Sequence, residues 1–121
     1  MSKILYIEDN EDNIFMLSMF LKRKGYEVFI AKDGQAGVDQ AKTLLPDLIL
    51  MDIGLPVLDG YAATQQIKKD EKTKHIPIII LTAHALSIDK EKALQSGADE
   101  YVSKPVNLQV LMKVLEKFNA K

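Results

Sequence analysis

The sequence contains no cysteine among its 121 residues. Disulfide bonds, zinc sites built on cysteine thiolates and thiol nucleophiles are therefore all excluded. The sequence also lacks a long apolar run near its start, because the first one covers only residues 3–7. A signal peptide or a membrane-spanning helix needs a much longer run. We therefore expect a soluble, cytoplasmic protein without membrane association.

A large excess of charge of either sign is absent as well. Sixteen Lys and Arg residues stand against seventeen Asp and Glu residues, which leaves a net charge of −1 and no basic block. Binding to nucleic acid phosphates has little electrostatic support in such a chain, and we expect none. Without repeats, low-complexity tracts or linkers, residues 1–121 are expected to form one domain with a real hydrophobic core.

What the sequence does contain is an alternation of strand and helix patterns. The apolar runs 3–7, 47–52 and 76–81 are nearly unbroken, which is typical of parallel strands covered on both faces, whereas 26–31 is weaker and 101–103 is short. Helical patterns occupy 10–24, 34–45, 60–70, 88–96 and the segment after Asn107. Five successive βα units predict a doubly wound α/β fold with a five-stranded parallel sheet and right-handed crossovers. The weak second strand is expected at an edge, which favours the order 2-1-3-4-5.

Capping residues bound these helices. Asp33, Asp59, Ser87 and Asn107 each precede a helical pattern as an N-cap would. Gly25 is expected to cap the first helix at its C-terminal end.

Polar residues follow four of the strand patterns at the point where each strand ends. Glu8 and Asp9 follow the first, Asp52 ends the third, Thr82 follows the fourth and Lys104 the fifth. Open α/β sheets bind their ligands at the carboxyl edge, at the switch point of the strand order, which here lies between strands 1 and 3. We therefore expect these five side chains to lie within reach of one another.

Converging carboxylates need a compensating charge. Two carboxylates about 4 Å apart repel by about 4 kcal/mol at an effective dielectric constant near 20. Glu8, Asp9 and Asp52 carry three negative charges against one positive charge on Lys104, a net of −2. A divalent cation would balance it, and a ligand set of hard oxygens favours Mg²⁺, or Mn²⁺, over zinc. Gly54 can turn its backbone carbonyl toward such an ion.

Asp52, at the end of the central strand, is the best placed nucleophile, because carboxylates form acyl phosphates in known catalysis. The Thr82 hydroxyl and the Lys104 ammonium can both donate to phosphoryl oxygens. Each residue alone also fits an ordinary role as a helix cap, a turn residue or a solvated charge. The agreement of four strand ends, in order, favours the phosphoryl-transfer site.

These residues resemble the receiver domain of two-component response regulators. The likeness spans the whole chain and rests on Glu8-Asp9-Asn10, the segment 50–56 (Leu-Met-Asp-Ile-Gly-Leu-Pro), Asp59-Gly60, Leu81-Thr82-Ala83, Gly97-Ala98 and Lys104-Pro105. With no output domain following, the chain is similar to single-domain regulators of the CheY and DivK kind, which implies the flavodoxin- or CheY-like fold.

The resemblance implies that Asp52 accepts a phosphoryl group from the phosphohistidine of a histidine kinase or a histidine phosphotransfer protein. It implies Mg²⁺ bound by Asp9, Asp52 and the carbonyl of Gly54, with Glu8 helping, in part through water. Glu8 stands where the family often has Asp, and its side chain is longer by one methylene group.

The resemblance also implies a conformational switch in which Thr82 and Tyr101 respond to phosphorylation, beside a cis peptide bond between Lys104 and Pro105. A downstream protein would then contact the face formed by the fourth helix, the fifth strand and the fifth helix, roughly 87–119. Such a protein is not an enzyme with a separate substrate, because it catalyses only its own phosphorylation and dephosphorylation. His84 lies near where water should reach the acyl phosphate, and its effect on phosphoryl lifetime is left open.

Two other functions compete with this hypothesis. A haloacid-dehalogenase-like phosphatase would need a second Asp two residues after the nucleophile, where this sequence has Gly54. An adaptor that never takes phosphate would not need Asp52, Thr82 and Lys104 intact.

The first helix also carries Phe15 and Met19 on the face opposite its buried stripe, which predicts contact with a phosphodonor helix or with a second copy in a homodimer.

Overall fold

The computed structural model describes residues 2–82, 91–92 and 94–119. Within these residues the chain forms one parallel sheet in the order β2-β1-β3-β4-β5, which confirms the predicted topology. The strands are β1 (Lys3–Ile7), β2 (Glu27–Ala31), β3 (Leu48–Asp52), β4 (Ile78–Thr82) and β5 (Glu100–Ser103). The helices are α1 (Glu11–Arg23), α2 (Gly34–Leu44), α3 (Gly60–Lys69) and α5 (Leu108–Asn119). The expected cap at Ser87 lies outside the described residues, as do residues 88–90 and 93 of the expected helix 88–96.

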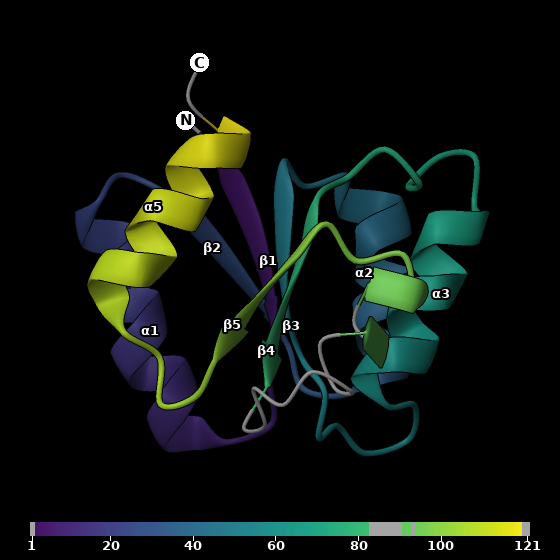
Figure 1. Ribbon diagram of the computed structural model, residues 1–121, viewed down its shortest axis with the longest axis horizontal. Helices are drawn as coiled ribbons and strands as arrows, with labels where there is room; N and C mark the ends of the chain where they lie inside the picture. Colours follow the sequence, from purple (N-terminus) through teal and green to yellow (C-terminus); the bar gives the residue numbers. More distant parts are fainter. Residues whose placement is uncertain (1, 83–90, 93, 120–121) are drawn as a thin grey trace.

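Helices cover both faces of the sheet (Figure 1). Helices α1 and α5 lie on one face, where Tyr6, Leu50 and Leu81 belong to one buried cluster. Helices α2 and α3 lie on the other face, against a second buried cluster that includes Met51 and Ile80. Because successive side chains of a strand point to opposite faces, the unbroken apolar runs of β3 and β4 supply both clusters.

The helices begin where the capping residues predicted. Asp33 accepts a hydrogen bond from the backbone N–H of Ala36 at 2.7 Å, Asp59 from that of Ala62 at 2.9 Å and Asn107 from that of Gln109 at 2.9 Å. Helix α1 is capped in the same way by Asn10, through the backbone N–H of Asn13 at 2.9 Å. At its other end Gly25 has a φ of 96°, the left-handed conformation expected after a helix. Among the described helices, none is long and apolar enough to span a membrane.

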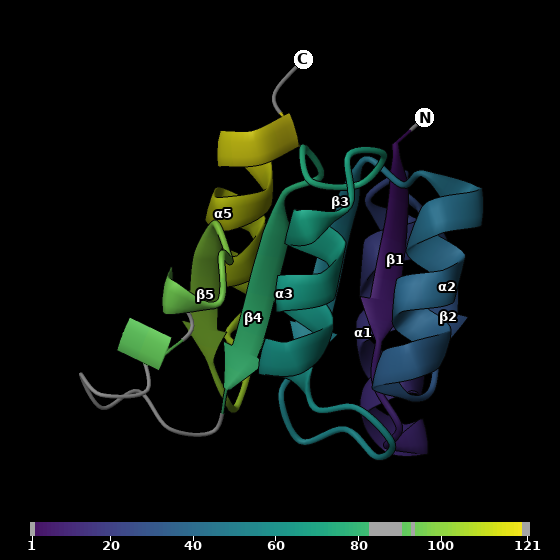
Figure 2. The ribbon, with the colours of Figure 1, turned by 90° about the vertical axis from the view of Figure 1, so that its right-hand side faces the viewer.

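The register of the sheet brings the strand ends level. Ile7 pairs with Met51, Asp52 pairs with Leu81, and Thr82 pairs with Ser103. All strands point the same way, toward the lower end in Figures 1 and 2. The polar residues that end or follow β1, β3, β4 and β5 are therefore brought to one edge.

The start of α3 fits tightly against this edge. A Cβ atom added at Gly60 would lie 2.4 Å from the backbone oxygen of Asp52, so only glycine permits this approach. The backbone N–H of Gly60 also donates to the carbonyl of Ile53 at 3.2 Å. The end of β3, which carries Asp52, is thus fixed by direct backbone contact.

Candidate phosphoryl-transfer site

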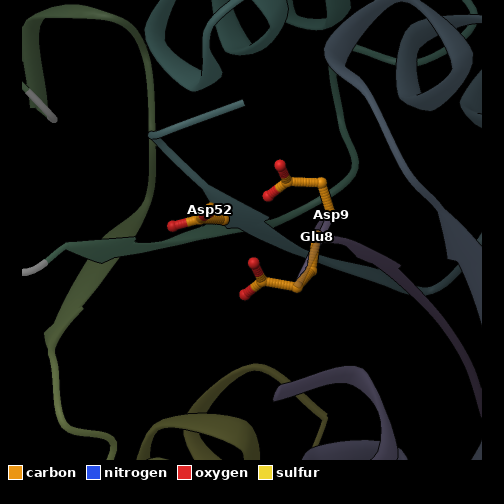
Figure 3. A group of neighbouring side chains, drawn as sticks. All are labelled: Glu8, Asp9 and Asp52. Carbon is orange, nitrogen blue, oxygen red and sulfur yellow. The ribbon is translucent and has the colours of Figure 1, made fainter. Parts of the chain in front are cut away.

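Three carboxylates converge at the carboxyl edge of the sheet. One oxygen from each of Glu8, Asp9 and Asp52 lies within 4.8 Å of the other two. Figure 3 shows the carboxyl groups of Glu8, Asp9 and Asp52 gathered together, with that of Asp52 to the left of the other two. Glu8 and Asp52 are buried and Asp9 is exposed, so the cluster opens to solvent on the Asp9 side. An ion could enter and retain water ligands there.

Lys104 is the cation that the structure places against this cluster. Its Nζ lies 2.6 Å from Oδ1 of Asp52 and 3.8 Å from Oε1 of Glu8. The backbone N–H of Lys104 donates to the carbonyl of Thr82 at 2.6 Å, and the Lys104–Pro105 peptide bond is cis, as expected. The geometry thus brings together the three acids and the lysine with their net charge of −2.

Glu8 is held by the protein on both carboxylate oxygens. The Tyr6 hydroxyl donates to Oε1 at 3.2 Å, and the backbone N–H of Asn10 donates to Oε2 at 3.3 Å. Burial raises the pKa of Glu8 above its ordinary value, and the charge of Asp52 adds to this, while Lys104 and the two hydrogen bonds act in the opposite direction. The metal-free cluster therefore resists carrying all its negative charge.

Tyr6 is the residue of this site that the sequence reasoning missed. Burial, followed by the charge of Glu8, raises the pKa of the Tyr6 hydroxyl far above its ordinary value, so it keeps its proton and donates. The signal in the sequence is the spacing of Tyr6 and Glu8, because side chains two residues apart in an extended segment share one face. In the sequence, Tyr6 is simply part of an apolar run.

The other predicted residues are found on β4, on β5 and in the segment after β3. Thr82 is fully buried at the end of β4, and Tyr101 on β5 is half-buried against the core between the sheet and α2 and α3. A Cβ added at Gly54 would lie 3.9 Å from Oδ2 of Asp52, an ordinary contact, so the space beside Asp52 does not require glycine. His84 lies outside the described residues.

A cavity of about 420 Å³ adjoins the acidic cluster. Glu8 and Lys104 line its polar side, while Met16, Leu17 and Val106 line its apolar side. It therefore lies between α1 and the segment that follows β5, next to Lys104.

Comparison with known proteins identifies the class to which this site belongs. The model of the response regulator receiver domain family matches residues 4–116, and the chain belongs to this family. It is 36% identical over 115 residues to the polar-differentiation response regulator DivK of Brucella abortus, covering 95% of this chain and 94% of DivK. It is also 44% identical over 120 residues to hybrid signal transduction histidine kinase I of Dictyostelium discoideum, covering 93% of this chain but only 7% of that kinase.

Solved structures agree. The receiver domain of sensor histidine kinase PA1611 from Pseudomonas aeruginosa, which has a magnesium ion coordinated in its active site cleft, matches with a TM-score of 0.92 and 40% identity, covering 99% of this chain and 98% of that one. The receiver domain of Ssk1 from Saccharomyces cerevisiae, solved with the histidine phosphotransfer protein Ypd1, matches with a TM-score of 0.92 and 36% identity, covering 98% and 89%. The chain is a phosphorelay receiver domain, a signalling protein rather than a classical enzyme.

Proposed function

We propose that Asp52 accepts a phosphoryl group from the phosphohistidine of a histidine kinase or histidine phosphotransfer protein, in a Mg²⁺-dependent reaction. The observation that carries this proposal is the 2.6 Å contact between Lys104 Nζ and Asp52 Oδ1 inside a cluster of net negative charge. A carboxylate flanked by a metal site and a cation can receive a phosphoryl group whose oxygens are then neutralised on two sides.

The residues present fit a magnesium ion. The cluster offers only oxygen ligands, it is open to water beside Asp9, and its charge exceeds what Lys104 balances. Asp9, Asp52 and the carbonyl of Gly54 would hold the ion, with Glu8 assisting. When bound, Mg²⁺ or Mn²⁺ would neutralise charge on the phosphoryl oxygens.

The residues of the chain supply the rest of the reaction. An Asp52 carboxylate oxygen forms the new bond to phosphorus while the bond from phosphorus to the histidine nitrogen breaks, and the released imidazole takes a proton from water. Lys104 and the Thr82 hydroxyl donate to the phosphoryl oxygens. The same groups would support hydrolysis of the acyl phosphate, so the domain would catalyse only its own phosphorylation and dephosphorylation.

Phosphorylation would change the conformation of the surface that β5 and α5 form. Thr82 ends β4, and Tyr101 lies on the paired strand, opposite Ile80. We expect Thr82 to move toward the phosphoryl oxygens and Tyr101 to turn inward behind it, because the new charge attracts hydrogen-bond donors. A downstream protein would bind the face formed by β5, α5 and the preceding segment, within 87–119.

The phosphodonor would dock on the outer face of α1. Phe15 is 68% exposed, Met16 60% and Met19 39%, which confirms the predicted outward direction of Phe15 and Met19 and adds Met16. The helix begins beside the acidic cluster, and Met16 also lines the cavity next to Lys104. A donor helix lying on this face would insert an apolar side chain into that cavity and bring its phosphohistidine to Asp52.

Acetyl phosphate tests the chemistry. With Mg²⁺ we expect stable incorporation of one phosphoryl group per chain, and with EDTA or in Asp52→Asn we expect none. Multiple turnover without labelling would indicate a phosphatase instead, and the absence of both would indicate an adaptor. Full labelling of Asp52→Asn would contradict the assignment of the nucleophile.

Phe15→Ser and Met19→Ser test the docking face, with the exposed Leu45→Ser as a matched control away from α1. We expect slower transfer from a phosphorylated histidine phosphotransfer domain, with unchanged labelling by acetyl phosphate. Loss of a homodimer, with transfer unchanged, would show that a second copy covers this face. A large fall in melting temperature would show that the two side chains belong to the core.

A further inference from the structure

Tyr6 on β1 and Glu8, which directly follows this strand, form a buried pair. Each is 1% exposed, and the Tyr6 hydroxyl donates to Oε1 of Glu8 at 3.2 Å. The other oxygen, Oε2, accepts from the backbone N–H of Asn10, and Lys104 Nζ lies 3.8 Å from Oε1. Each carboxylate oxygen of Glu8 therefore has a hydrogen-bond donor from the protein.

Glu8 needs this support more than a shorter acid would. Its side chain has one more rotatable bond than Asp, so more freedom must be lost before its carboxylate is placed. The group is also buried, where an ionised carboxylate is tolerated only if hydrogen bonds and charges compensate it. Of its two hydrogen-bond donors, only the Tyr6 hydroxyl comes from a side chain that a substitution can remove.

We propose that Tyr6 is a positioning residue for the metal site. Its hydroxyl holds the carboxylate of Glu8 beside Asp9 and Asp52, in the arrangement shown in Figure 3, and so sets the strength of Mg²⁺ binding. The inference rests on the proposed Mg²⁺-dependent function. Loss of a group that orients a metal-binding side chain typically weakens metal affinity about 10- to 100-fold. Because Asn10 still holds one Glu8 oxygen, we expect the lower end of that range.

The hydroxyl can be removed without removing the packing. The Tyr6 ring belongs to the buried cluster beneath α1 and α5, together with Leu17 and Leu81. Tyr6→Phe keeps this ring and deletes only the donor. Tyr26→Phe is the matched control, because Tyr26 is a partly buried tyrosine that packs on the same cluster but is not part of the site.

The test is calorimetric titration of the metal-free protein with Mg²⁺. We expect the dissociation constant of Tyr6→Phe to rise about tenfold, and that of Tyr26→Phe to match wild type. In a Glu8→Asp background, Tyr6→Phe should have no further effect, because the shorter carboxylate no longer reaches the hydroxyl. This coupling between the two positions is what a role through Glu8 requires.

The other results overturn the proposal. An unchanged dissociation constant with a lower melting temperature would show that Tyr6 serves folding alone. Tighter Mg²⁺ binding would show that the hydroxyl holds Glu8 away from the ion. An equal loss in the Glu8→Asp background would show an effect that bypasses Glu8. If wild type itself bound no Mg²⁺, the proposed function would fail with it, whereas the other three results leave that function intact.

Discussion

Two lysine–aspartate pairs stand at opposite ends of the same sheet. At the carboxyl edge Lys104 Nζ lies 2.6 Å from Asp52 Oδ1, and at the amino ends of β4 and β5 Lys68 Nζ lies 2.8 Å from Asp99 Oδ2. The distances are nearly equal, so distance does not distinguish the two pairs. The charges and hydrogen bonds around each pair do distinguish them.

The Lys68 pair is saturated with hydrogen bonds. Lys68 also donates to the carbonyls of Lys74 at 3.2 Å and Ile76 at 2.8 Å, and Asp99 accepts from the backbone N–H of Ile78 at 2.9 Å. All three ammonium protons therefore have acceptors, and the pair ties the end of α3 to the starts of β4 and β5. One lysine balances one acid, so this pair attracts no further ion.

The Lys104 pair is not balanced. Lys104 faces Asp52 and Glu8 together, and Asp9 stands within the same cluster. Burial and Asp52 raise the pKa of Glu8, which records the unfavourable charge. A site that retains net charge in this way favours the binding of a cation, as the proposed function requires. The difference between the two pairs is thus one of charge balance and hydrogen-bond saturation.

The largest expected effect separates the two lysines by activity. Lys104→Met should slow labelling by acetyl phosphate about 100-fold or more, because removing one preorganised donor to a reacting group typically has that effect. Lys68→Met, the matched variant, should label within about twofold of wild type, because Lys68 lies at the other end of the sheet. Equal losses in initial rate would erase the distinction between the pairs.

Magnesium should raise the free energy of unfolding only when the acidic cluster at the carboxyl edge is intact. At a concentration 100 times the dissociation constant, a ligand that binds only the folded state raises the free energy of unfolding by about 2.7 kcal/mol. Urea unfolding with Mg²⁺ and with EDTA should show this increment in wild type and in Asp99→Asn, and most of it should disappear in Asp52→Asn. An increment that survives in Asp52→Asn would place the ion elsewhere.

Stability in EDTA should move in opposite directions at the two ends. Lys68→Met should lower the free energy of unfolding by about 1–3 kcal/mol, because it leaves carbonyl groups and a carboxylate without their donor. Asp52→Asn should be as stable as wild type or more stable, because repulsion from Glu8 and Asp9 is relieved. Urea midpoints measured at one pH would decide, and a strongly destabilised Asp52→Asn would contradict the account of charge imbalance.

The smallest expected effect is a pH dependence. Because the folded pKa of Glu8 is raised above its ordinary value of 4.5, its contribution to stability is fully present below pH 4.5 and is lost as pH rises through the folded pKa. One proton changes the free energy of unfolding by at most about 1.4 kcal/mol per pH unit. In EDTA, wild type should therefore lose stability relative to Glu8→Gln as pH rises. Parallel curves for the two proteins would contradict this.

Much of the site could be predicted because strand patterns and the polar residues that end them lie next to each other in the chain. Glu8, Asp9, Asp52 and Lys104 were placed together on that ground, and the structure brings them together. The role of the Tyr6 hydroxyl could not be predicted, because a tyrosine in an apolar run is ordinarily core. Lys68 was equally hidden, because the end of α3 is rich in lysine and solvated charges are common there.

The sequence by itself determined the order of the elements, the caps at Asp33, Asp59 and Asn107 and which polar residues meet at the carboxyl edge. Those features depend on periodicity and on neighbours within a few residues. Only the tertiary structure decided that the Tyr6 hydroxyl holds Glu8, that Lys68 pairs with Asp99 and that Met16 is left uncovered. Such contacts depend on how long side chains and distant elements settle against each other, and no local pattern in the chain encodes that.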